Sequence, residues 1–312
     1  MSKVAVVGAG AVGTAIAYAA QIRGTCRELA LFDLNAGKVR AEVLDLNHGL
    51  QFTPMAGITG SDDLEVCAGA DVVVITAGAK QDPGQTRLDL AAANVAMCRD
   101  LVPSLVQLAP DALLLVVTNP VDVVTYAAQK FSGLPAHRVF GSGTVLDSSR
   151  LRFLIAEHTR VAVQNVHAYI AGEHGDSEVP LWSTATIGGV PVKDWTGNGA
   201  RVLDEEARAR IHQQVVSSAY EIIAGKGATS LAIGLAVSRI LEAVLHDEHR
   251  VLPVTSLLDD VHGISDVCLS MPSGVGRSGV ESVLATPLSD EERAALTASA
   301  EAVTAVARSL GL

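Results

Sequence analysis

The stretch that decides the fold is Lys3–Gly13, KVAVVGAGAVG, near the start of a 312-residue chain. Its first part is a short run of Val and Ala, typical of a buried β-strand. Gly8, Gly10 and Gly13 then have the spacing G-x-G-x-x-G, and the pattern that follows predicts a helix ending at Gly24. A glycine-rich turn between a strand and a helix is typical of a site that holds a dinucleotide pyrophosphate.

The three glycines and one carboxylate predict which dinucleotide binds. Gly8 permits a tight turn, Gly10 lets the backbone approach a pyrophosphate, and Gly13 lets the helix pack on the strand. The N-terminus of that helix attracts phosphates. Asp33 ends the second predicted strand, 20 residues after Gly13, where a carboxylate binds a ribose diol and repels a 2′-phosphate. NAD is therefore predicted over NADP; the alternative is that the glycines mark a turn and Asp33 caps a loop. The residues expected to contact the cofactor are Gly8, Gly10, Val12, Gly13, Asp33, Gly78 and Asn119.

Outward from this motif, the first half of the chain alternates short apolar runs with longer helical patterns. Strands that are apolar on both faces and separated by helices predict a parallel sheet covered on both sides. Such strands within residues 1–142 predict a doubly wound (Rossmann) α/β domain that binds a dinucleotide. The expected strands are Lys3–Val7, Glu28–Phe32, Ile58–Gly60, Val72–Thr76, Leu113–Val117 and Val139–Gly141. The expected helices are Val12–Arg23, one capped by Asn35 that runs to His48, Leu88–Ala109 and Val121–Ser132.

The second half, residues 143–312, has a different pattern and predicts a mixed α+β substrate-binding domain. Helices are expected at Thr144–His158, Asp204–Ile223, Ala228–His246 and Ser289–Leu310. Strands are expected at Val166–Ala171, Val251–Leu258 and Ser265–Met271, with a hairpin at Ile187–Val192.

Composition argues against several classes of protein. Lys plus Arg total 23 and Asp plus Glu total 34, and the net charge of −11 is a poor match for nucleic acid or an anionic membrane surface. No apolar run has the length of a transmembrane helix. The segment Lys3–Ala20 also resembles a secretory signal, but the glycine spacing favours a strand, a turn and a helix.

The cysteines and histidines give no sign of a metal centre. Four dispersed cysteines form neither a disulfide framework nor a zinc-binding pattern, which favours a reducing, cytoplasmic setting. The segment His246–His249 holds possible ligands, but a histidine at a helix end also complements the helix dipole. We therefore expect no metal.

Two predicted strand ends carry side chains suited to substrate binding. Residues 77–90, AGAKQDPGQTRLDL, follow the fourth strand, and ligands of such sheets bind beyond the carboxyl ends of strands. A loop there can close and bring Arg87 to a substrate; the alternative is a solvated arginine at a helix start. Asn119, after the fifth strand, offers an amide where a nicotinamide is expected; the alternative is a helix cap before Pro120.

A third group of residues is suited to acid–base chemistry. Asp147 and Arg150 are three residues apart on one predicted helix and share a face. Arg150 can bind a carboxylate bidentately, while Asp147 can orient His174 of the motif Gly172–Asp176. A histidine whose proton is fixed by a carboxylate is a good acid–base group near neutral pH. The alternatives are a local Asp147–Arg150 ion pair and a structural histidine.

These motifs resemble those of the lactate and malate dehydrogenase family over nearly the whole chain, and within it the bacterial L-lactate dehydrogenases. The combination that carries the resemblance is Gly141–Thr144 with Asp147, Gly172–Asp176 and Lys226–Thr229. The resemblance implies an NAD-dependent L-2-hydroxy acid dehydrogenase that interconverts pyruvate and L-lactate in fermentative glycolysis.

The same resemblance implies roles for the matching residues. His174 would exchange a proton with the 2-keto oxygen, and Asp147 would stabilise the imidazolium. Arg150 would anchor the substrate carboxylate, and Arg87 would polarise the carbonyl once its loop has closed. Asn119 and Thr229 would complete the substrate pocket.

The resemblance also places the residue that reads the substrate at Gln81. Malate dehydrogenases usually have Arg there, because oxaloacetate carries a second carboxylate that is costly to bury without a cation. Neutral Gln81 favours a methyl-bearing keto acid such as pyruvate. The neighbouring Lys80 is expected to face solvent. A malate or other 2-hydroxy acid dehydrogenase is the alternative enzyme.

Regulation and assembly are implied by the resemblance. Arg152 and His167 match a fructose bisphosphate site at a subunit interface in bacterial lactate dehydrogenases; the alternative is two ordinary surface cations. A homotetramer is expected on the same ground. A non-catalytic dinucleotide-binding sensor on the same fold is the alternative from a different class. The joint presence of four residues argues against it: Arg87, Asp147, Arg150 and His174.

Overall fold

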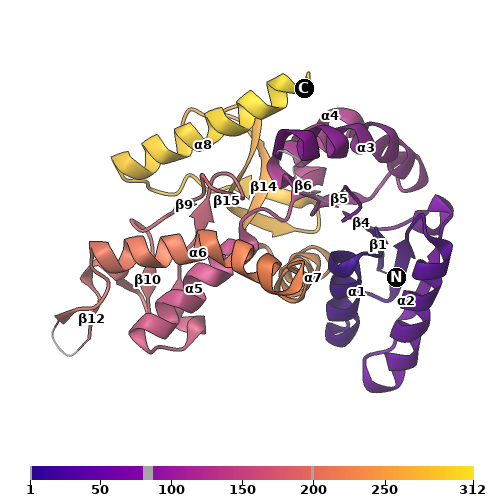
Figure 1. Ribbon diagram of the computed structural model, residues 1–312, viewed down its shortest axis with the longest axis horizontal. Helices are drawn as coiled ribbons and strands as arrows, with labels where there is room; N and C mark the ends of the chain where they lie inside the picture. Colours follow the sequence, from indigo (N-terminus) through magenta and orange to yellow (C-terminus); the bar gives the residue numbers. More distant parts are fainter. Residues whose placement is uncertain (1, 80–86, 198–199) are drawn as a thin grey trace.

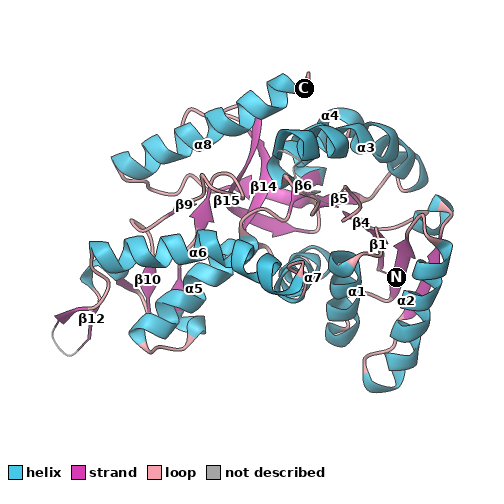
Figure 2. Ribbon diagram, in the orientation of Figure 1, coloured by secondary structure: helices cyan, strands magenta, loops and turns pink. Residues whose placement is uncertain are grey.

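The computed structural model describes residues 2–79, 87–197 and 200–312. Its centre is one sheet that runs through both halves of the chain, with helices on both faces (Figures 1 and 2). In the first half the strands are β1 (Lys3–Val7), β2 (Glu28–Phe32), β3 (Gly57–Ser61), β4 (Val72–Ile75), β5 (Leu113–Val116) and β6 (Val139–Gly141). The helices between them are α1 (Ala11–Arg23), α2 (Ala36–His48), α3 (Arg87–Leu108) and α4 (Val121–Ser132).

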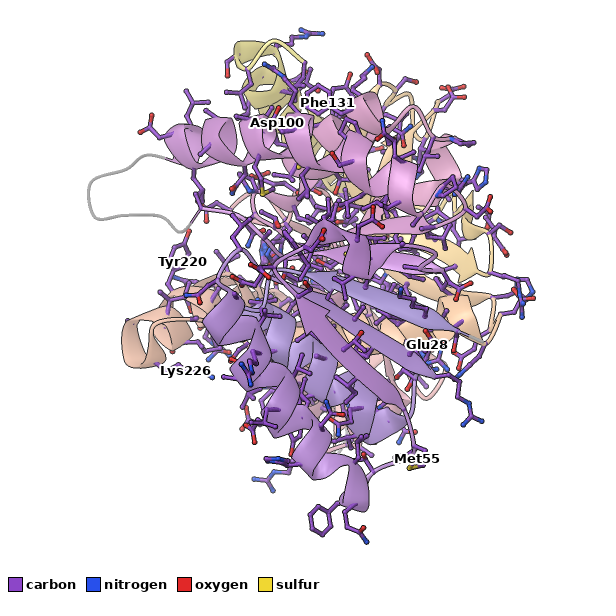
Figure 3. The ribbon with its side chains drawn as sticks, turned by 90° about the vertical axis from the view of Figure 1, so that its right-hand side faces the viewer. Glu28, Met55, Asp100, Phe131, Tyr220 and Lys226 are labelled. Atoms are coloured by element: carbon purple, nitrogen blue, oxygen red, sulfur yellow. The ribbon has the colours of Figure 1, made fainter. Side chains whose placement is uncertain are left out.

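These six strands are parallel in the order β3-β2-β1-β4-β5-β6. The order reverses between β1 and β4, and loops at the carboxyl ends of strands on either side of such a reversal form a crevice where dinucleotides bind. The predicted doubly wound fold is therefore confirmed. Glu28, at the beginning of β2, lies on the opposite side of the molecule from Tyr220 and Lys226 (Figure 3).

Apolar side chains on the two faces of the sheet bury different helices. One face packs on α1, α2 and α7 (Leu231–Leu245) through residues such as Val6, Ile16 and Val237. The other packs on α3 and α4 through residues such as Leu105 and Val124. This agrees with the expectation of strands that are apolar on both faces.

The sheet continues beyond the predicted boundary at 142/143. Strands β14 (Arg250–Leu258), β15 (Val267–Gly276) and β16 (Gly279–Val283) add an antiparallel extension. It joins the parallel part where Thr255 of β14 pairs with Gly141 of β6. The sequence did not predict β16 or the end of β15, because their Gly and Ser residues have low strand propensity and pair only through tertiary contacts.

The rest of the second half surrounds this extension. Its helices are α5 (Val145–Thr159), α6 (Glu205–Lys226), α7 and α8 (Asp290–Ser309), and α8 begins with a capping box between Ser289 and Glu292. Its short strands are β7 (Val166–His167), β8 (Ile170–Ala171), β9 (Val179–Pro180), β10 (Thr186–Ile187), β11 (Val190–Pro191), β12 (Thr196–Gly197) and β13 (Ala200–Arg201).

The expectation of one strand at Val166–Ala171 was wrong, because this segment forms two short strands that pair with different strands. β7 pairs with β10, whereas β8 pairs with β9. Helix α7 also begins at Leu231 rather than Ala228, since Gly227 ends α6 in a left-handed conformation and a short loop follows.

Helix α7 docks the second half on the first. A side chain at Gly234 would lie 2.6 Å from the carbonyl oxygen of Ala15, so the small residue lets α7 approach α1 closely. Near the end of the contact, Glu242 accepts hydrogen bonds from Arg23 of α1 and from Arg239. Among the described residues, no helix combines the length and the hydropathy needed to cross a bilayer.

Candidate active site

The glycine loop after β1 has the geometry of a phosphate cradle. Gly8 has a φ of +104°, and a Cβ on it would lie 2.7 Å from the backbone nitrogen of Ala77. A Cβ on Gly13 would lie 1.9 Å from the carbonyl oxygen of Gly8, so only glycine lets α1 approach the strand. A Cβ on Gly10 would meet nothing within 4 Å, so this position opens on free space, as pyrophosphate approach requires. Half-buried Val12 lies in the first turn of α1, beside the loop.

Asp33 fits the predicted ribose-binding role by its position at the end of β2. Its carboxylate accepts hydrogen bonds from the backbone N–H of Ala9, at 2.8 Å, and of Asn35, at 3.0 Å. Asp33 thus links the glycine loop to the start of α2. These bonds to backbone N–H groups also fit the alternative prediction, in which Asp33 caps a loop. The open side of Gly10, the free end of α1 and this carboxylate together fit an NAD-type dinucleotide.

The loops after β4 and β5 are held together by Asn94, which the sequence did not single out. Its buried side chain accepts a hydrogen bond from the N–H of Ala79, at 2.8 Å, and donates one to the carbonyl oxygen of Asn119, at 2.7 Å. A Cβ on Gly78 would lie 2.5 Å from the Thr118 methyl group, so these loops touch. The N-cap of α4 is Pro120, without a side-chain cap, so Asn119 is not the helix cap considered as the alternative.

The predicted acid–base group is assembled by α5 and the loop between β8 and β9. His174 Nδ1 lies 2.5 Å from Asp147 Oδ2, and Arg150 Nη1 donates to Asp147 Oδ1 at 2.6 Å. Asp147 is buried, while the side chains of Arg150 and His174 are 12% and 25% exposed. The Asp147 carboxylate therefore contacts both Arg150 and His174. The local ion pair with Arg150, predicted as the alternative, and the predicted contact with His174 are both present. Among the residues that the structure describes, only Nδ1 of the His174 ring has a hydrogen-bond partner, so Nε2 can contact a substrate.

Electrostatics keeps this group charged. Burial opposes a charge on His174, but the charge and the hydrogen bond of Asp147 outweigh it and raise the pKa of His174 to about 9. Burial likewise opposes ionisation of Asp147, but His174 and Arg150 outweigh it and lower the pKa of Asp147. His174 is consequently an imidazolium at neutral pH, which suits a proton donor.

The backbone of His174 is held by a second buried carboxylate, Asp122, to which the sequence reasoning gave no role. Asp122 Oδ2 accepts from the N–H of His174 at 2.8 Å, and Oδ1 accepts from the hydroxyl of Thr255 at 2.6 Å. Burial raises the pKa of Asp122 to about 6. Because Asp122 belongs to α4 and His174 to the second half, this contact connects the two halves at the site. The position of Asp122 in the first turn of α4, directly after the loop of Asn119, was the feature of the sequence that could have indicated this role.

Other predicted site residues are only partly described. Gln81 lies outside the described residues, and Arg87 begins α3 but its side chain lies outside them. Thr229 is half-buried in the loop between α6 and α7. Their substrate roles stay predictions.

The predicted effector residues lie on two elements, Arg152 on α5 and His167 on β7. Arg152 donates through Nε to the carbonyl oxygen of Ala168, at 2.8 Å, and its guanidinium lies 4.7 Å from the centre of the Tyr169 ring. His167 is exposed on β7, next to Ala168. Arg152 thus contacts the residue that follows His167, and the effector role stays a prediction.

One exposed group could present three ligand atoms to a metal ion among the described residues: Asp247, His249 and Glu281. His249 Nδ1 lies 2.7 Å from Glu281 and Nε2 lies 3.7 Å from Asp247, so both ring nitrogens already face carboxylates. The contacts with Glu281 and Asp247 raise the pKa of His249. An ion-paired histidine explains the cluster.

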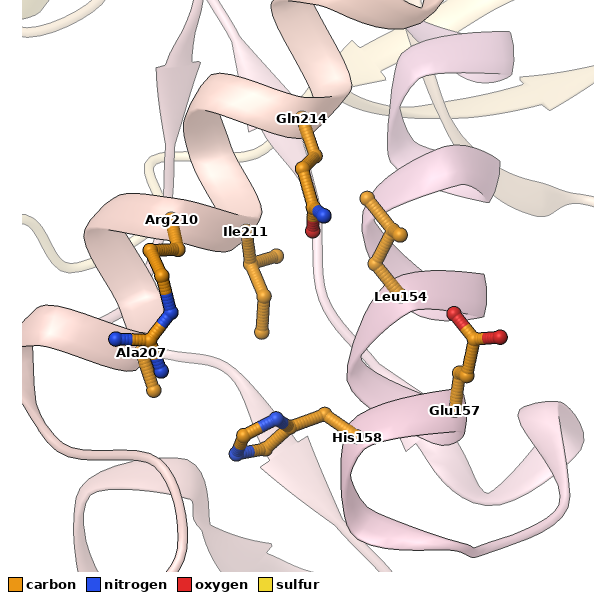
Figure 4. A pocket seen from close by; sticks show the side chains of 7 residues that line it. All are labelled: Leu154, Glu157, His158, Ala207, Arg210, Ile211 and Gln214. Atoms are coloured by element: carbon orange, nitrogen blue, oxygen red, sulfur yellow. The ribbon is translucent and has the colours of Figure 1, made fainter.

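A cavity of about 280 Å³ lies between α5 and α6 (Figure 4). It is on the far turns of α5 from Asp147 and Arg150, and it contains none of the predicted site residues. Its lining is Leu154, Glu157, His158, Ala207, Arg210, Ile211 and Gln214.

Comparisons with known proteins agree with this geometry. Residues 2–141 match the family model of the lactate/malate dehydrogenase NAD binding domain, and residues 144–309 match that of its alpha/beta C-terminal domain. The chain is 58% identical to an L-lactate dehydrogenase of Bifidobacterium animalis subsp. lactis, over 99% of this chain and 97% of the relative. It is 47% identical to one of Acetivibrio thermocellus, over 94% and 92%.

Solved structures give the same result. A minor L-lactate dehydrogenase of Enterococcus mundtii in a ligand-bound form has a TM-score of 0.95 at 40% identity, covering 99% of this chain and 98% of that one. A lactate dehydrogenase from a Medee basin deep-sea metagenome library has a TM-score of 0.95 at 39% identity, covering 100% and 99%. The chain belongs to the lactate/malate dehydrogenase family and is an NAD-dependent oxidoreductase that acts on 2-hydroxy acids.

Proposed function

We propose that this protein reversibly reduces pyruvate to L-lactate with NADH, as an enzyme of fermentative glycolysis in a cytoplasmic setting. The observation that carries the proposal is the joined group of His174, Asp147 and Arg150 beside the carboxyl edge of the dinucleotide-binding sheet. The names of the similar L-lactate dehydrogenases support it. The buried free thiols of all four cysteines agree with a reducing compartment.

Each residue of the group has one task in this reaction. Arg150 binds the carboxylate of the keto acid and fixes its orientation, which makes the transfer effectively unimolecular. His174 donates the proton at Nε2 to the ketone oxygen and takes it back in the reverse direction. Asp147 holds the Nδ1 side and stabilises the imidazolium. Arg87 polarises the carbonyl, as the family resemblance implies. Bound NADH supplies the hydride, and Gly8, Gly10, Gly13 and Asp33 would hold it.

Selection between keto acids is assigned to Gln81. Because an amide offers no countercharge to the second carboxylate of oxaloacetate, pyruvate is the preferred substrate. Replacing Gln81 with Arg should raise kcat/KM for oxaloacetate relative to pyruvate by about tenfold or more. The ratio is obtained from NADH oxidation with each acid, and an unchanged ratio would remove Gln81 from this role. That outcome would favour the alternative enzyme, a dehydrogenase of malate or another 2-hydroxy acid.

We also propose that fructose bisphosphate activates the enzyme through Arg152 and His167. Arg152 of α5 contacts the residue that follows His167 of β7, which supports an anion site formed by these two side chains. The sugar bisphosphate should lower the KM for pyruvate and make the substrate curve less sigmoidal. Arg152→Gln should abolish that response and leave the activity without effector unchanged. A full response in the variant would refute the assignment.

The proposed assembly is a homotetramer. Neighbouring helices α1 and α7 expose Tyr18, Ile22, Leu231 and Leu235, at 55%, 49%, 71% and 56%. Apolar side chains gathered in this way favour contact with another protein surface. Light scattering of the purified protein should give four times the mass of one chain.

The experiment that tests the function most simply measures NADH oxidation with pyruvate and with oxaloacetate, each with and without fructose bisphosphate. Turnover of pyruvate well above that of oxaloacetate is expected. NADH binding without turnover of either acid would favour the sensor alternative.

A further inference from the structure

Glu178 is a buried carboxyl beside the acid–base group that the reaction described above does not use. It lies four residues after His174, just before β9, and is only 5% exposed. The loop that carries both residues is closed by the N–H of Glu178, which donates to the carbonyl oxygen of Gly175 at 3.4 Å. Within the described part of the chain, its atom Oε1 is buried and has no hydrogen-bond partner. Such an atom is costly and calls for an explanation.

Titratable groups on three elements lie around Glu178. From α5, Asp147 repels its negative charge and Arg150 attracts it. From its own loop, His174 attracts the charge and Asp176 repels it. From α6, His212 interacts with the backbone carbonyl of Glu178. Burial and then Asp147 outweigh the attractions and raise the pKa of Glu178 to about 8, so the side chain is an uncharged acid at neutral pH.

We propose that Glu178 is a positioning residue that controls how well the Asp147–Arg150–His174 group holds an anionic keto acid. With Glu178 uncharged, the side chains of Asp147, Arg150 and His174 together carry one net positive charge, which attracts the carboxylate of the substrate. Once Glu178 loses its proton, the net charge of the four side chains is zero and the attraction for the substrate weakens. This inference rests on the proposed reduction of a 2-keto acid.

The same charge acts on His174 in the opposite sense. An ionised Glu178 stabilises the imidazolium and contributes to the raised pKa of His174. Loss of the Glu178 charge should therefore improve substrate binding in the pH range where His174 keeps its proton, and His174 should lose that proton at lower pH. A residue that only supports the fold would not separate KM from kcat in this way.

The test compares the wild type with Glu178→Gln, an isosteric and permanently uncharged side chain. We measure kcat and KM for pyruvate from pH 6.5 to pH 10. At pH 6.5 the two KM values should agree within about twofold, because neither side chain is charged there. At pH 8.5 the KM of the variant should be lower than that of the wild type by about threefold or more. The alkaline fall of kcat in the variant should begin at lower pH. Wild-type turnover at pH 6.5 tests the proposed reaction separately.

Two further variants separate the effect of the Glu178 charge from other changes of charge. Glu157→Gln removes one exposed negative charge from the far turns of α5, and its KM profile should match the wild type. Asp176→Asn removes a charge that raises the pKa of Glu178, so the rise in KM should begin at lower pH. In the double variant with Glu178→Gln, that shift should disappear. Superimposed KM profiles for the wild type and Glu178→Gln would overturn the proposal, as would an equal loss of activity at every pH.

Discussion

The two sides of His174 are held by two buried aspartates that differ in their electrostatics. On the side of the ring, Asp147 touches two cations and its pKa is lowered. On the side of the backbone, Asp122 accepts from an N–H and a hydroxyl, and its pKa is raised to about 6. Both are only 2% exposed. The partner therefore decides whether a buried carboxylate drives chemistry or fixes position.

The largest effect on catalysis is expected when the contact between Asp147 and the His174 ring is removed. Asp147→Asn removes the charge that keeps His174 protonated, and kcat for pyruvate reduction should fall by roughly 10²- to 10⁴-fold, the range of general acid–base catalysis. The fall should be steepest above neutral pH, where the unassisted imidazole has lost its proton. Steady-state NADH oxidation between pH 6 and pH 9 measures it. A variant with wild-type kcat at pH 8 would contradict the role of Asp147.

A smaller effect on catalysis is expected when the contact between Asp122 and the backbone N–H of His174 is weakened. Asp122→Asn keeps one acceptor oxygen and should reduce kcat by about tenfold, through slight misplacement of His174. Its pH dependence has a defined sign. Since folding raises the pKa of Asp122, proton uptake below pH 6 favours the folded wild type, and Asn cannot take up a proton.

Urea unfolding at two pH values checks that sign. Between pH 7 and pH 5, the free energy of unfolding of the wild type should rise relative to Asp122→Asn by about 1 kcal/mol. A difference between the two proteins that does not change with pH would show that Asp122 has an ordinary pKa.

The smallest effect on catalysis is expected at Glu242, which resembles Asp147 in its surroundings but lies outside the site. It is 6% exposed, pairs with Arg23 and Arg239, and these arginines outweigh burial and lower its pKa. Glu242→Gln should cost about 1–2 kcal/mol of stability, because its partners are partly solvated. Thermal unfolding should occur a few degrees lower while kcat stays unchanged. A loss of kcat without a loss of stability would mean that α1 and α7 act on the site.

The first half of the molecule was readable from sequence because its signals are local. Each expected strand through Val139–Gly141 appears within two residues of its predicted ends, and Asn35 caps α2 as expected. Glycine spacing and apolar runs depend on neighbours along the chain, so the positions of Gly8, Gly13 and Asp33 could be predicted from the sequence alone.

The second half was less readable because long-range pairing decides it. The run Val166–Ala171 becomes two strands with different partners, and β16 forms from residues with little strand propensity. Asp147 and His174 could be paired through a known motif. Asp122 and Glu178 could not, since their roles arise from burial and from residues distant in sequence.

The role of Asp147 is tested most directly by the titration of His174 itself, followed by NMR of histidine-labelled protein in the wild type and in Asp147→Asn. The wild-type imidazole should titrate near pH 9, and the imidazole of the variant should titrate at clearly lower pH. A wild-type His174 that titrates near 6.5, unchanged by the substitution, would contradict the claim that Asp147 holds the proton for the reaction.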